Sequence, residues 1–289
     1  MTGLNEREKV GLVLEGGGMR GLYTAGVLDV FLAENIWPDG VIGVSAGAIH
    51  GCSYMSEQLG RSVRYNLKYA NDKRYMSFKS WLKTGNIFNV DFCYNTLPNE
   101  LSVYDYDTFE KNAAKVPFYV GCSNVETGKA EYIKCTDFRT QMDAMRASAS
   151  LPLVSKIVEY DGMKLLDGGT CDSIPVAFFK SIGYEKNIVV LTRPEGYEKK
   201  PDKTIKVLEK VYSDYPEYVQ ACKERHEEYN KSLQYIEHYE KEGKIFVIRP
   251  SRNIKISRLE KNKDKLKYMY KMGHYDAKSK LKELKKFMA

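Results

Sequence analysis

Hydrophobic residues occur in this chain in two alternating patterns. Wholly apolar runs lie at 10–14, 41–44, 118–122, 188–191 and 245–248, and the longer segments between them tend to repeat apolar positions every three or four residues. The first pattern is typical of strands buried on both faces, and the second of helices that bury one face. Their alternation predicts an α/β fold around a mainly parallel central sheet flanked by helices.

The same patterns predict the positions of the main helices. We expect helices over 19–35, 46–55 and 207–242, and a basic helical tail over 257–287. Residues 130–135 alternate apolar and polar positions, which predicts a hairpin with the strand that begins at 118. Residues 61–115 are rich in aromatic and polar residues, so this insertion either covers a pocket or packs as ordinary helices.

Composition indicates a folded protein without a membrane-spanning segment. Hydrophobic residues make up 43% of the chain and charged residues 29%, and no run of about 18 apolar residues occurs. The polar stretch Met1 to Lys9 lacks the apolar core of a signal peptide. The six cysteines form no C-x-x-C motif, so we expect free thiols in a reducing cytosol.

The glycine-rich segment Gly16–Gly21 follows the first apolar run and opens a helix. Its G-x-G-x-x-G spacing matches the dinucleotide-binding fingerprint, which needs an acidic residue at the end of the second strand. Asp39 precedes that strand instead, which disfavours a nucleotide. Alternatively, the amides of Gly16–Gly18 stabilise an oxyanion, while Arg20 holds the loop or adds positive potential. A tight turn without a ligand is the third interpretation.

A candidate nucleophile stands where the second apolar run meets the second helix. Gly43-Val44-Ser45-Ala46-Gly47 matches G-x-S-x-G, a pattern that arises by chance in roughly one chain in ten of this length. Its placement therefore carries the inference. A sharp strand-to-helix turn exposes the serine Oγ, and the helix N-terminus favours negative charge there.

A serine nucleophile needs a base, and the four histidines are poor candidates. His50 follows Ser45 by five residues on the same helix, which turns its side chain away from Oγ, so we expect a packing residue. The other three histidines lie in the charged last third. Asp167 remains, at the end of a short apolar strand and before two glycines; burial would raise its pKa. An Asp-Gly turn without chemistry is the alternative.

These three motifs, Gly16–Gly21, Gly43–Gly47 and Asp167–Gly169, resemble in order and spacing those of the patatin-like phospholipase family, over about residues 8–195. The resemblance implies an α/β sandwich and a catalytic dyad of Ser45 and Asp167 in place of a triad. It also implies an oxyanion hole at Gly16, Gly17 and Gly18, with Arg20 at the basic position of the first motif. No metal or cofactor is required by such a mechanism.

The last third resembles the C-terminal extension of bacterial patatin-like proteins, notably at Lys255–Glu260 and Gly273–Ala277. We therefore expect an acyl hydrolase domain over 8–195 and a helical extension with one late strand over 196–289, packed on the first. Net charge is −3 over residues 1–198 and +10 over 199–289. The basic extension is a candidate for peripheral membrane contact, against the alternative of a solvated helical face, and no motif indicates nucleic-acid binding.

Together these patterns predict a cytoplasmic serine esterase or lipid acyl hydrolase, phospholipase A-like, that is either free or peripheral at a membrane. Its partner is a lipid or other ester substrate. The lipid class and the acyl position are open at this stage, as are the oligomeric state and any lid. A lipid- or acyl-binding module with little turnover is the alternative function.

Overall fold

The computed structural model describes residues 7–289, so the first six residues of the polar N-terminal stretch lie outside the described part. Within this part, no helix is both long and apolar enough to cross a bilayer. The strands are β1 (Val10–Leu14), β2 (Gly40–Val44), β3 (Phe118–Asn124), β4 (Ala130–Cys135), β5 (Val158–Tyr160), β6 (Met163–Asp167), β7 (Lys186–Val190) and β8 (Ile245–Ile248).

Helices connect and cover these strands. They are α1 (Leu22–Ala33), α2 (Ala46–Met55), α3 (Arg61–Tyr69), α4 (Phe78–Thr84), α5 (Tyr106–Ala113), α6 (Met142–Ser148), α7 (Val176–Ser181), α8 (Ile205–Val211), α9 (Pro216–Lys241), α10 (Lys263–Ser279) and α11 (Leu281–Met288). The remaining elements are two short 3-10 helices, η1 (Gly18–Gly21) and η3 (Gly168–Thr170), and a π-helix, η2 (Phe92–Leu101).

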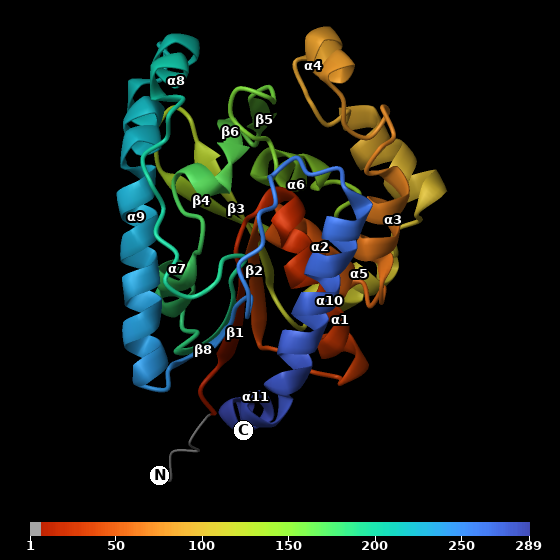
Figure 1. Ribbon diagram of the computed structural model, residues 1–289, viewed down its shortest axis with the longest axis vertical. Helices are drawn as coiled ribbons and strands as arrows, with labels where there is room; N and C mark the ends of the chain where they lie inside the picture. The colour runs from red at the N-terminus through yellow and green to blue at the C-terminus, as the bar shows by residue number, and fades with distance from the viewer. Residues whose placement is uncertain (1–6) are drawn as a thin grey trace.

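All eight strands form one sheet in the order β5-β6-β3-β2-β1-β7-β8, with β4 paired to β3. The pairs from β3 through β2, β1 and β7 to β8 are parallel, while β4, β5 and β6 pair antiparallel. Figure 1 shows this sheet between helices on both sides. The predicted α/β class and the hairpin of β3 with β4 are confirmed.

The sheet is buried on both faces, which explains its unbroken apolar strands. In β1, Leu12 and Leu14 pack in the core beneath α1, α2 and α10, whereas Val13 faces the core beneath α7 and α9. Side chains along a strand alternate between faces, so each strand needs apolar residues at every position.

The bounds of three predicted helices differ in the structure. The α-helix predicted from residue 19 starts at Leu22, because residues 18–21 form the tighter 3-10 turn η1, in which the Arg20 amide donates to the Gly17 carbonyl (3.3 Å). The segment 207–242 divides into α8 and α9, since Pro216 starts a new helix. The tail becomes helical only at Lys263, where the Asn262 side chain caps α10.

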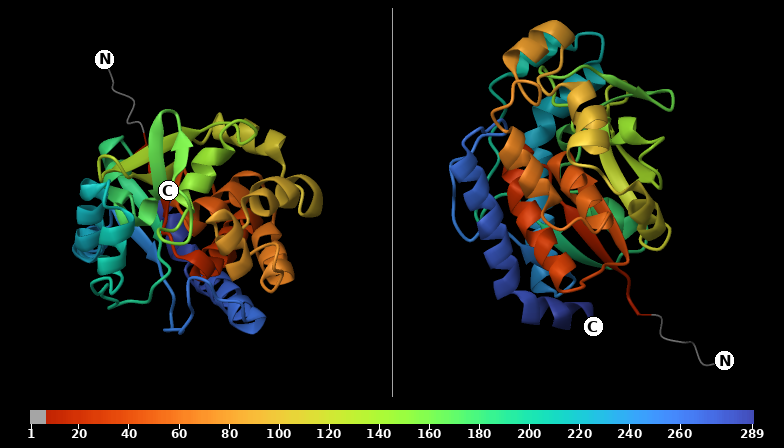
Figure 2. Two further views of the ribbon diagram at one scale, coloured as in Figure 1. Left: turned by 90° about the horizontal axis from the view of Figure 1, so that it is seen from above. Right: turned by 90° about the vertical axis from the view of Figure 1, so that its right-hand side faces the viewer.

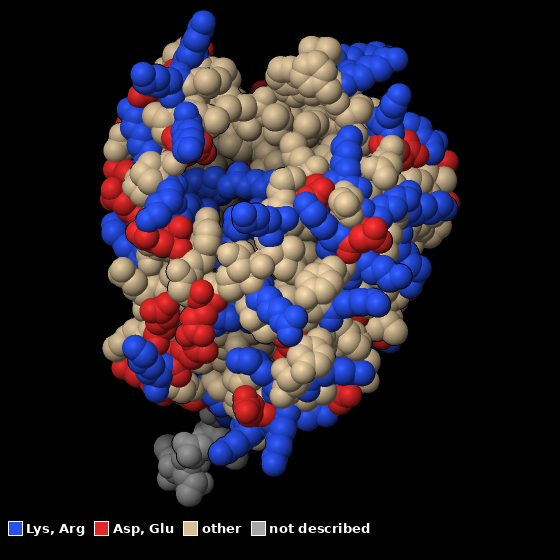
Figure 3. Space-filling view, viewed as in Figure 1, with Lys and Arg blue, Asp and Glu red and all other residues tan. Residues whose placement is uncertain are grey.

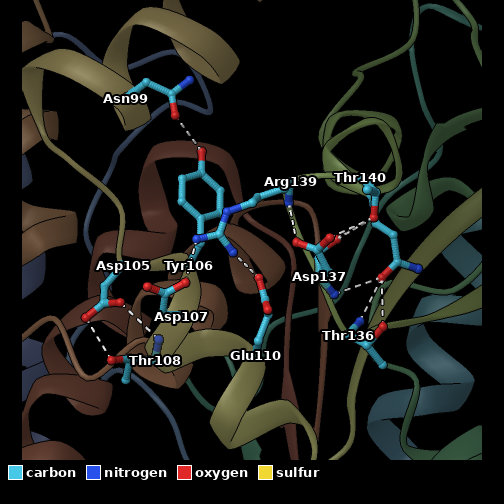
Figure 4. A network of polar contacts seen from close by, with 11 residues as sticks. Asn99, Asp105, Tyr106, Asp107, Thr108, Glu110, Thr136, Asp137, Arg139 and Thr140 are labelled. Carbon is cyan, nitrogen blue, oxygen red and sulfur yellow. Dashed lines mark hydrogen bonds and ion pairs between the residues drawn. The ribbon is translucent and has the colours of Figure 1, made fainter.

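Residues 61–115 form α3, α4, η2 and α5 beside α2 and α6 (Figure 2). A polar network connects α5 to the segment between β4 and α6 (Figure 4). In this network Arg139 forms ion pairs with Asp107 and Glu110 of α5. The Tyr106 hydroxyl of the same helix donates to Asn99 in η2 (3.0 Å). The insertion is thus tied to the chain that leads from β4 into α6.

The C-terminal extension is joined closely to the rest of the chain. Strand β8 lies beside β7 in the sheet, and α10 lies alongside α1 (Figures 1 and 2). A Cβ on Gly26 would lie 2.1 Å from the Tyr270 carbonyl oxygen, and one on Gly273 would lie 2.0 Å from that of Tyr23. Only glycine permits this helix contact. The boundary expected at residue 195 stays a prediction.

The tail was a candidate for membrane contact, with a packed and solvated helix as the alternative, and most apolar side chains of α10 point into the core. Leu266, Met269 and Met272 are buried in the core, whereas Tyr268 and Tyr275 are exposed. The periodicity of this helix therefore reflects packing on α1.

Candidate active site

Ser45 occupies the turn between β2 and α2 with a φ of 54°, a conformation that is strained for a residue with a side chain. Its amide donates to the Ser148 Oγ of α6 (2.9 Å), and the Ser148 hydroxyl donates to the Gly121 carbonyl of β3 (2.6 Å). A Cβ on Gly47 would lie 2.3 Å from the Leu14 carbonyl oxygen. The glycine therefore lets α2 start directly against β1.

Strand β3 brings Asp167 to Ser45. Val44 pairs with Gly121 of β3, and Asp167 pairs with the next residue, Cys122. Because β4 occupies the other edge of β3, β6 takes over from β2 along the same edge. The residue that follows β2 and the last residue of β6 consequently meet, although 122 positions separate them in sequence.

The Ser45 hydroxyl donates to Asp167 Oδ2 at 2.5 Å, and the Gly169 amide donates to Oδ1 at 2.8 Å. Both side chains are nearly enclosed, with exposed fractions of 6% for Ser45 and 4% for Asp167. Burial raises the pKa of Asp167 above its ordinary value, and the bonds from Ser45 and Gly169 oppose that shift. A carboxylate with a raised pKa is a stronger base than an exposed one.

The glycine loop next to Ser45 has free amides at two positions. No acceptor for the Gly17 or Gly18 N–H group occurs among residues 7–289, whereas the Gly16 amide donates to the Ser173 carbonyl (3.4 Å). A Cβ on Gly16 would lie 3.2 Å from Ser45 Cβ, so the loop passes directly over the serine. Of the three glycines predicted for an oxyanion hole, Gly17 and Gly18 thus offer the available donors.

Arg20 is buried just behind this loop, with 7% of its surface exposed and its Nε without an acceptor in the described chain. Burial and the neighbouring charge of Arg193 together lower its pKa to about 10. The predicted contribution of positive potential fits this position. The nearby Glu15 carboxylate accepts from Tyr229 and Thr192.

No histidine is bonded to the Ser45–Asp167 pair in the described part of the chain, although His50 and His226 each line one of the two cavities described below. The His50 Nδ1 is 3.1 Å from the Ser62 Oγ, and burial lowers the pKa of His50 to about 4. His226 lines the cavity that is described below as the cationic cavity, and its Nδ1 is 3.0 Å from the Lys223 carbonyl oxygen. None of the hydrogen bonds within residues 7–289 joins a histidine to Ser45 or Asp167.

The structure does not support nucleotide binding by the glycine loop, because Asp39 lies too far from the loop to hold a ribose. The Asp39 carboxylate accepts from the Val10 amide (2.7 Å), at the start of β1 and thus at the opposite end of that strand from the loop. Within residues 7–289, no cluster of three or more metal-binding side chains occurs. All six cysteines are free thiols.

Two cavities meet at Ser45. The first, called here the apolar cavity, has a volume of about 130 Å³ and lies among α2, α6 and the insertion 61–115. The second, called the cationic cavity, has a volume of about 310 Å³ and lies toward α9 and the chain before α10. Gly18, Ser45 and Leu151 line both.

Sequence reasoning missed several residues of this site. Ser148 accepts a hydrogen bond from the Ser45 amide, and four residues that were not predicted supply positive charge to the cationic cavity: Arg193, Lys199, Arg225 and Arg258. Only Arg258 had a signal, because it lies in the segment 255–260 that resembles the bacterial extension. Their convergence depends on how the last third folds back over the glycine loop.

Two family models match this chain. The model described as patatin-like phospholipase matches residues 12–180, and a domain of unknown function, DUF6363, matches residues 215–289. A protein of Escherichia coli (strain K12), "Uncharacterized protein YjjU", is 26% identical over 269 residues, which cover 92% of this chain and 75% of that protein.

Fungal lysophospholipases share a shorter region. Lysophospholipase nte1 of Emericella nidulans is 30% identical over 183 residues, which cover 60% of this chain and 11% of that protein. The chain thus spans a small part of these long relatives. Among solved structures, VipD from Legionella pneumophila aligns with a TM-score of 0.41 and 11% identity, over 94% of this chain and 67% of that one.

Proposed function

The chain belongs to the patatin-like phospholipase family, and on that basis we propose that it hydrolyses carboxylic ester bonds of lipids with Ser45 as nucleophile and Asp167 as general base. The family and its lysophospholipase relatives support lipid ester hydrolysis in general. The observation that carries the residue assignment is the 2.5 Å hydrogen bond from the Ser45 hydroxyl to Asp167, at the junction of two cavities.

In the proposed mechanism, the Ser45 Oγ attacks the ester carbonyl carbon while its proton passes to Asp167. The carbonyl oxygen becomes an oxyanion, which the Gly17 and Gly18 amides stabilise. Collapse of this intermediate breaks the ester C–O bond, and the alcohol leaves with the proton from Asp167. Water then attacks the acyl enzyme, with Asp167 again as base, so that a carboxylic acid leaves and Ser45 regains its proton.

The apolar cavity supports an acyl chain as the group transferred to serine. It is lined mainly by side chains of the insertion and its neighbours: Leu22, Ile49, Tyr65, Phe88, Tyr94, Leu97, Pro98, Phe138, Met142 and Met145. Its one cation, Arg61, donates to the Ser102 carbonyl and is thereby satisfied within the protein. An alkyl chain can therefore enter without leaving a charge unpaired.

The test is hydrolysis of p-nitrophenyl esters and labelling by a fluorophosphonate probe. Ser45→Ala should abolish both, whereas Ser181→Ala, which alters an exposed serine of α7, should leave both at the wild-type level. Turnover by Ser45→Ala equal to wild type would refute the dyad. If wild-type protein binds a lipid but neither turns over nor labels, the alternative of a binding module replaces the hydrolase.

Contact with a lipid surface is part of the same proposal, but we assign it to α4 and α8 instead of the tail. Phe78 and Leu82 of α4 and Val207 and Val211 of α8 are exposed, and each helix also carries two lysines. The Leu153 backbone links the two helices: its carbonyl accepts from Trp81 in α4, and its amide donates to Tyr212 at the end of α8. Exposed apolar side chains among lysines suit an anionic bilayer.

Co-sedimentation with phosphatidylglycerol vesicles tests this assignment. The double variant Phe78→Ser with Leu82→Ser should bind fewer vesicles than wild type, because the apolar contribution of α4 is lost. The matched variant Tyr268→Ser with Tyr275→Ser changes the exposed aromatic residues of α10 and should bind as wild type does. The reverse result would return the contact to the tail.

A further inference from the structure

The cationic cavity holds charges that the protein does not neutralise. Seven Lys and Arg side chains line it, against three acidic ones: Arg20, Arg193, Lys199, Lys200, Lys203, Arg225 and Arg258 against Glu15, Asp167 and Asp202. Among residues 7–289, the side chains of Arg193, Lys199 and Arg258 have no hydrogen-bond acceptor and no ion-pair partner. Figure 3 shows the Lys and Arg atoms on this face, below a hollow of uncharged atoms between α4 and α8.

These cations are close enough to oppose one another. Burial lowers the pKa of Lys199, and the charges of Arg225 and Arg258 lower it further. Burial and Arg225 likewise lower the pKa of Arg258. Groups with this mutual repulsion are stabilised when an anion enters between them. Such a cavity is incomplete without an anion, in contrast to an ordinary solvated surface of lysines.

The unpaired charges lie next to the reacting groups. The Arg258 carbonyl accepts from the Met19 amide in the glycine loop, and Arg225 donates to the Gly169 carbonyl, two residues after Asp167. Arg225 and Arg258 also lower the pKa of Asp167, which requires proximity. An anion in this cavity would therefore lie close to an ester carbonyl at Ser45.

The cavity disfavours a choline head group. A quaternary ammonium group is recognised through aromatic faces or a nearby carboxylate. The ring of Tyr197 is already covered by Arg193, and that of Tyr229 by Lys199 at 3.9 Å. The Glu15 carboxylate is occupied by the hydroxyl of Tyr229 and by Thr192. A positively charged head group would meet seven Lys and Arg side chains here against three acidic ones.

We propose that the cationic cavity binds the phosphate of the lipid substrate, so that the enzyme prefers glycerophospholipids or lysophospholipids whose head group carries no positive charge, phosphate monoesters above all. The proposal rests on the function proposed above and names the substrate class of that same site. In this arrangement the acyl chain occupies the apolar cavity, the ester lies at Ser45 and the phosphate lies among Lys199, Arg225 and Arg258. The C-terminal extension thus determines head-group selection.

Binding can be measured without turnover by using Ser45→Ala as the parent protein. Isothermal titration calorimetry with sn-glycerol 3-phosphate should show binding, and glycerol should show none. Adding Arg258→Gln should raise the Kd for sn-glycerol 3-phosphate about 10- to 100-fold, which is the usual effect of losing a charge-assisted hydrogen bond. Arg258→Lys should retain most of the affinity. Arg252→Gln removes the same charge from an exposed position in the same segment and should change nothing.

Selectivity is measured with wild-type protein and monomeric 1-acyl-glycerol 3-phosphate and 1-acyl-glycerophosphocholine. The ratio of their kcat/KM values should favour the phosphate monoester at least about 10-fold, and this ratio should fall toward 1 in Arg258→Gln. It should keep its wild-type value in Arg252→Gln. Unfolding curves of each variant show whether the fold is intact, and Arg258→Lys provides the charge-conserving comparison.

Each contrary outcome has a separate meaning. If sn-glycerol 3-phosphate fails to bind, the phosphate site is wrong. If inorganic phosphate binds equally well and the two lysolipids are hydrolysed at the same rate, the cavity binds free phosphate and the head-group assignment is wrong. If binding depends on Arg258 as expected but no ester is hydrolysed, the phosphate site stands and the hydrolase function fails.

Discussion

The apolar cavity and the cationic cavity meet at the same serine but differ in how far the protein satisfies its own groups. In the apolar cavity, the one cation is hydrogen-bonded to a backbone carbonyl, and the aromatic side chains pack against one another. In the cationic cavity, several buried or half-buried charges have no partner in the described chain. Because burying an unpaired charge costs free energy that a bound anion would offset, this difference supports the proposed phosphate site in the second cavity.

The two cavities also come from different parts of the chain. The insertion 61–115 and α6 form most of the apolar cavity, and residues after 192 supply most of the charge of the other. Ser45 lines both cavities, and its partner Asp167 lines the cationic one. Changes to this pair should therefore lower activity on every substrate, whereas changes to one cavity should mainly alter which substrates the protein prefers.

The largest effect is expected from Asp167→Asn, which removes the proposed base of Ser45, the serine that lines both cavities. We expect kcat/KM to fall about 10²- to 10⁴-fold for neutral and anionic esters alike, since general base catalysis has this size. Asp161→Asn, in the turn between β5 and β6, is the matched control and should retain activity. Full activity of Asp167→Asn on either ester class would show that the base lies elsewhere.

The next largest effect concerns how the extension is attached. Gly273→Ala places a Cβ 2.0 Å from the Tyr23 carbonyl, so α1 and α10 must separate. Overpacking of this kind lowers the free energy of unfolding by about 1–3 kcal/mol. Urea denaturation measures the loss, with the exposed Lys267→Ala on the same helix expected to be neutral. Equal stability of both variants would contradict the tight helix contact.

A smaller effect is expected when the apolar cavity alone is narrowed. Ile49→Trp fills space beside Ser45, so the ratio of kcat/KM for p-nitrophenyl decanoate over acetate should fall about 10-fold. The exposed Leu59→Trp adds the same side chain outside the cavity and should preserve the ratio. If Ile49→Trp changes sn-glycerol 3-phosphate binding instead, the two cavities are not separate subsites.

The smallest effect is a shift in the pH dependence of kcat/KM, which is expected when a cation near Asp167 is removed. Asp167 must be ionised to accept a proton, and burial raises its pKa, so kcat/KM should decline as the pH falls through that raised value. Arg258 favours the ionised carboxylate. Arg258→Gln should therefore move the acid limb for p-nitrophenyl butyrate to higher pH, and Arg252→Gln should leave it in place. An unmoved limb would show that Arg258 does not act on Asp167.

Local pattern was sufficient for the strands of the central sheet that are apolar at every position and for the turn that holds Ser45, but not for the helices of the insertion 61–115. The apolar runs predicted five strands, because a strand buried on both faces needs an apolar residue at nearly every position. The strand, serine and helix that form the turn at 40–55 are contiguous, so their arrangement follows from short-range geometry. The glycine loop was also located from its sequence, although only the structure distinguishes the engaged amide of Gly16 from the free ones of Gly17 and Gly18.

Contacts between distant segments decided the rest. Asp167 reaches Ser45 only because β2 and β6 share one edge of β3, a register that no local pattern contains. The periodicity of α10 indicates that one face is covered but cannot say that α1 covers it. The cationic cavity forms only when 199, 225 and 258 converge, because charge along a sequence carries no information about which charges become neighbours.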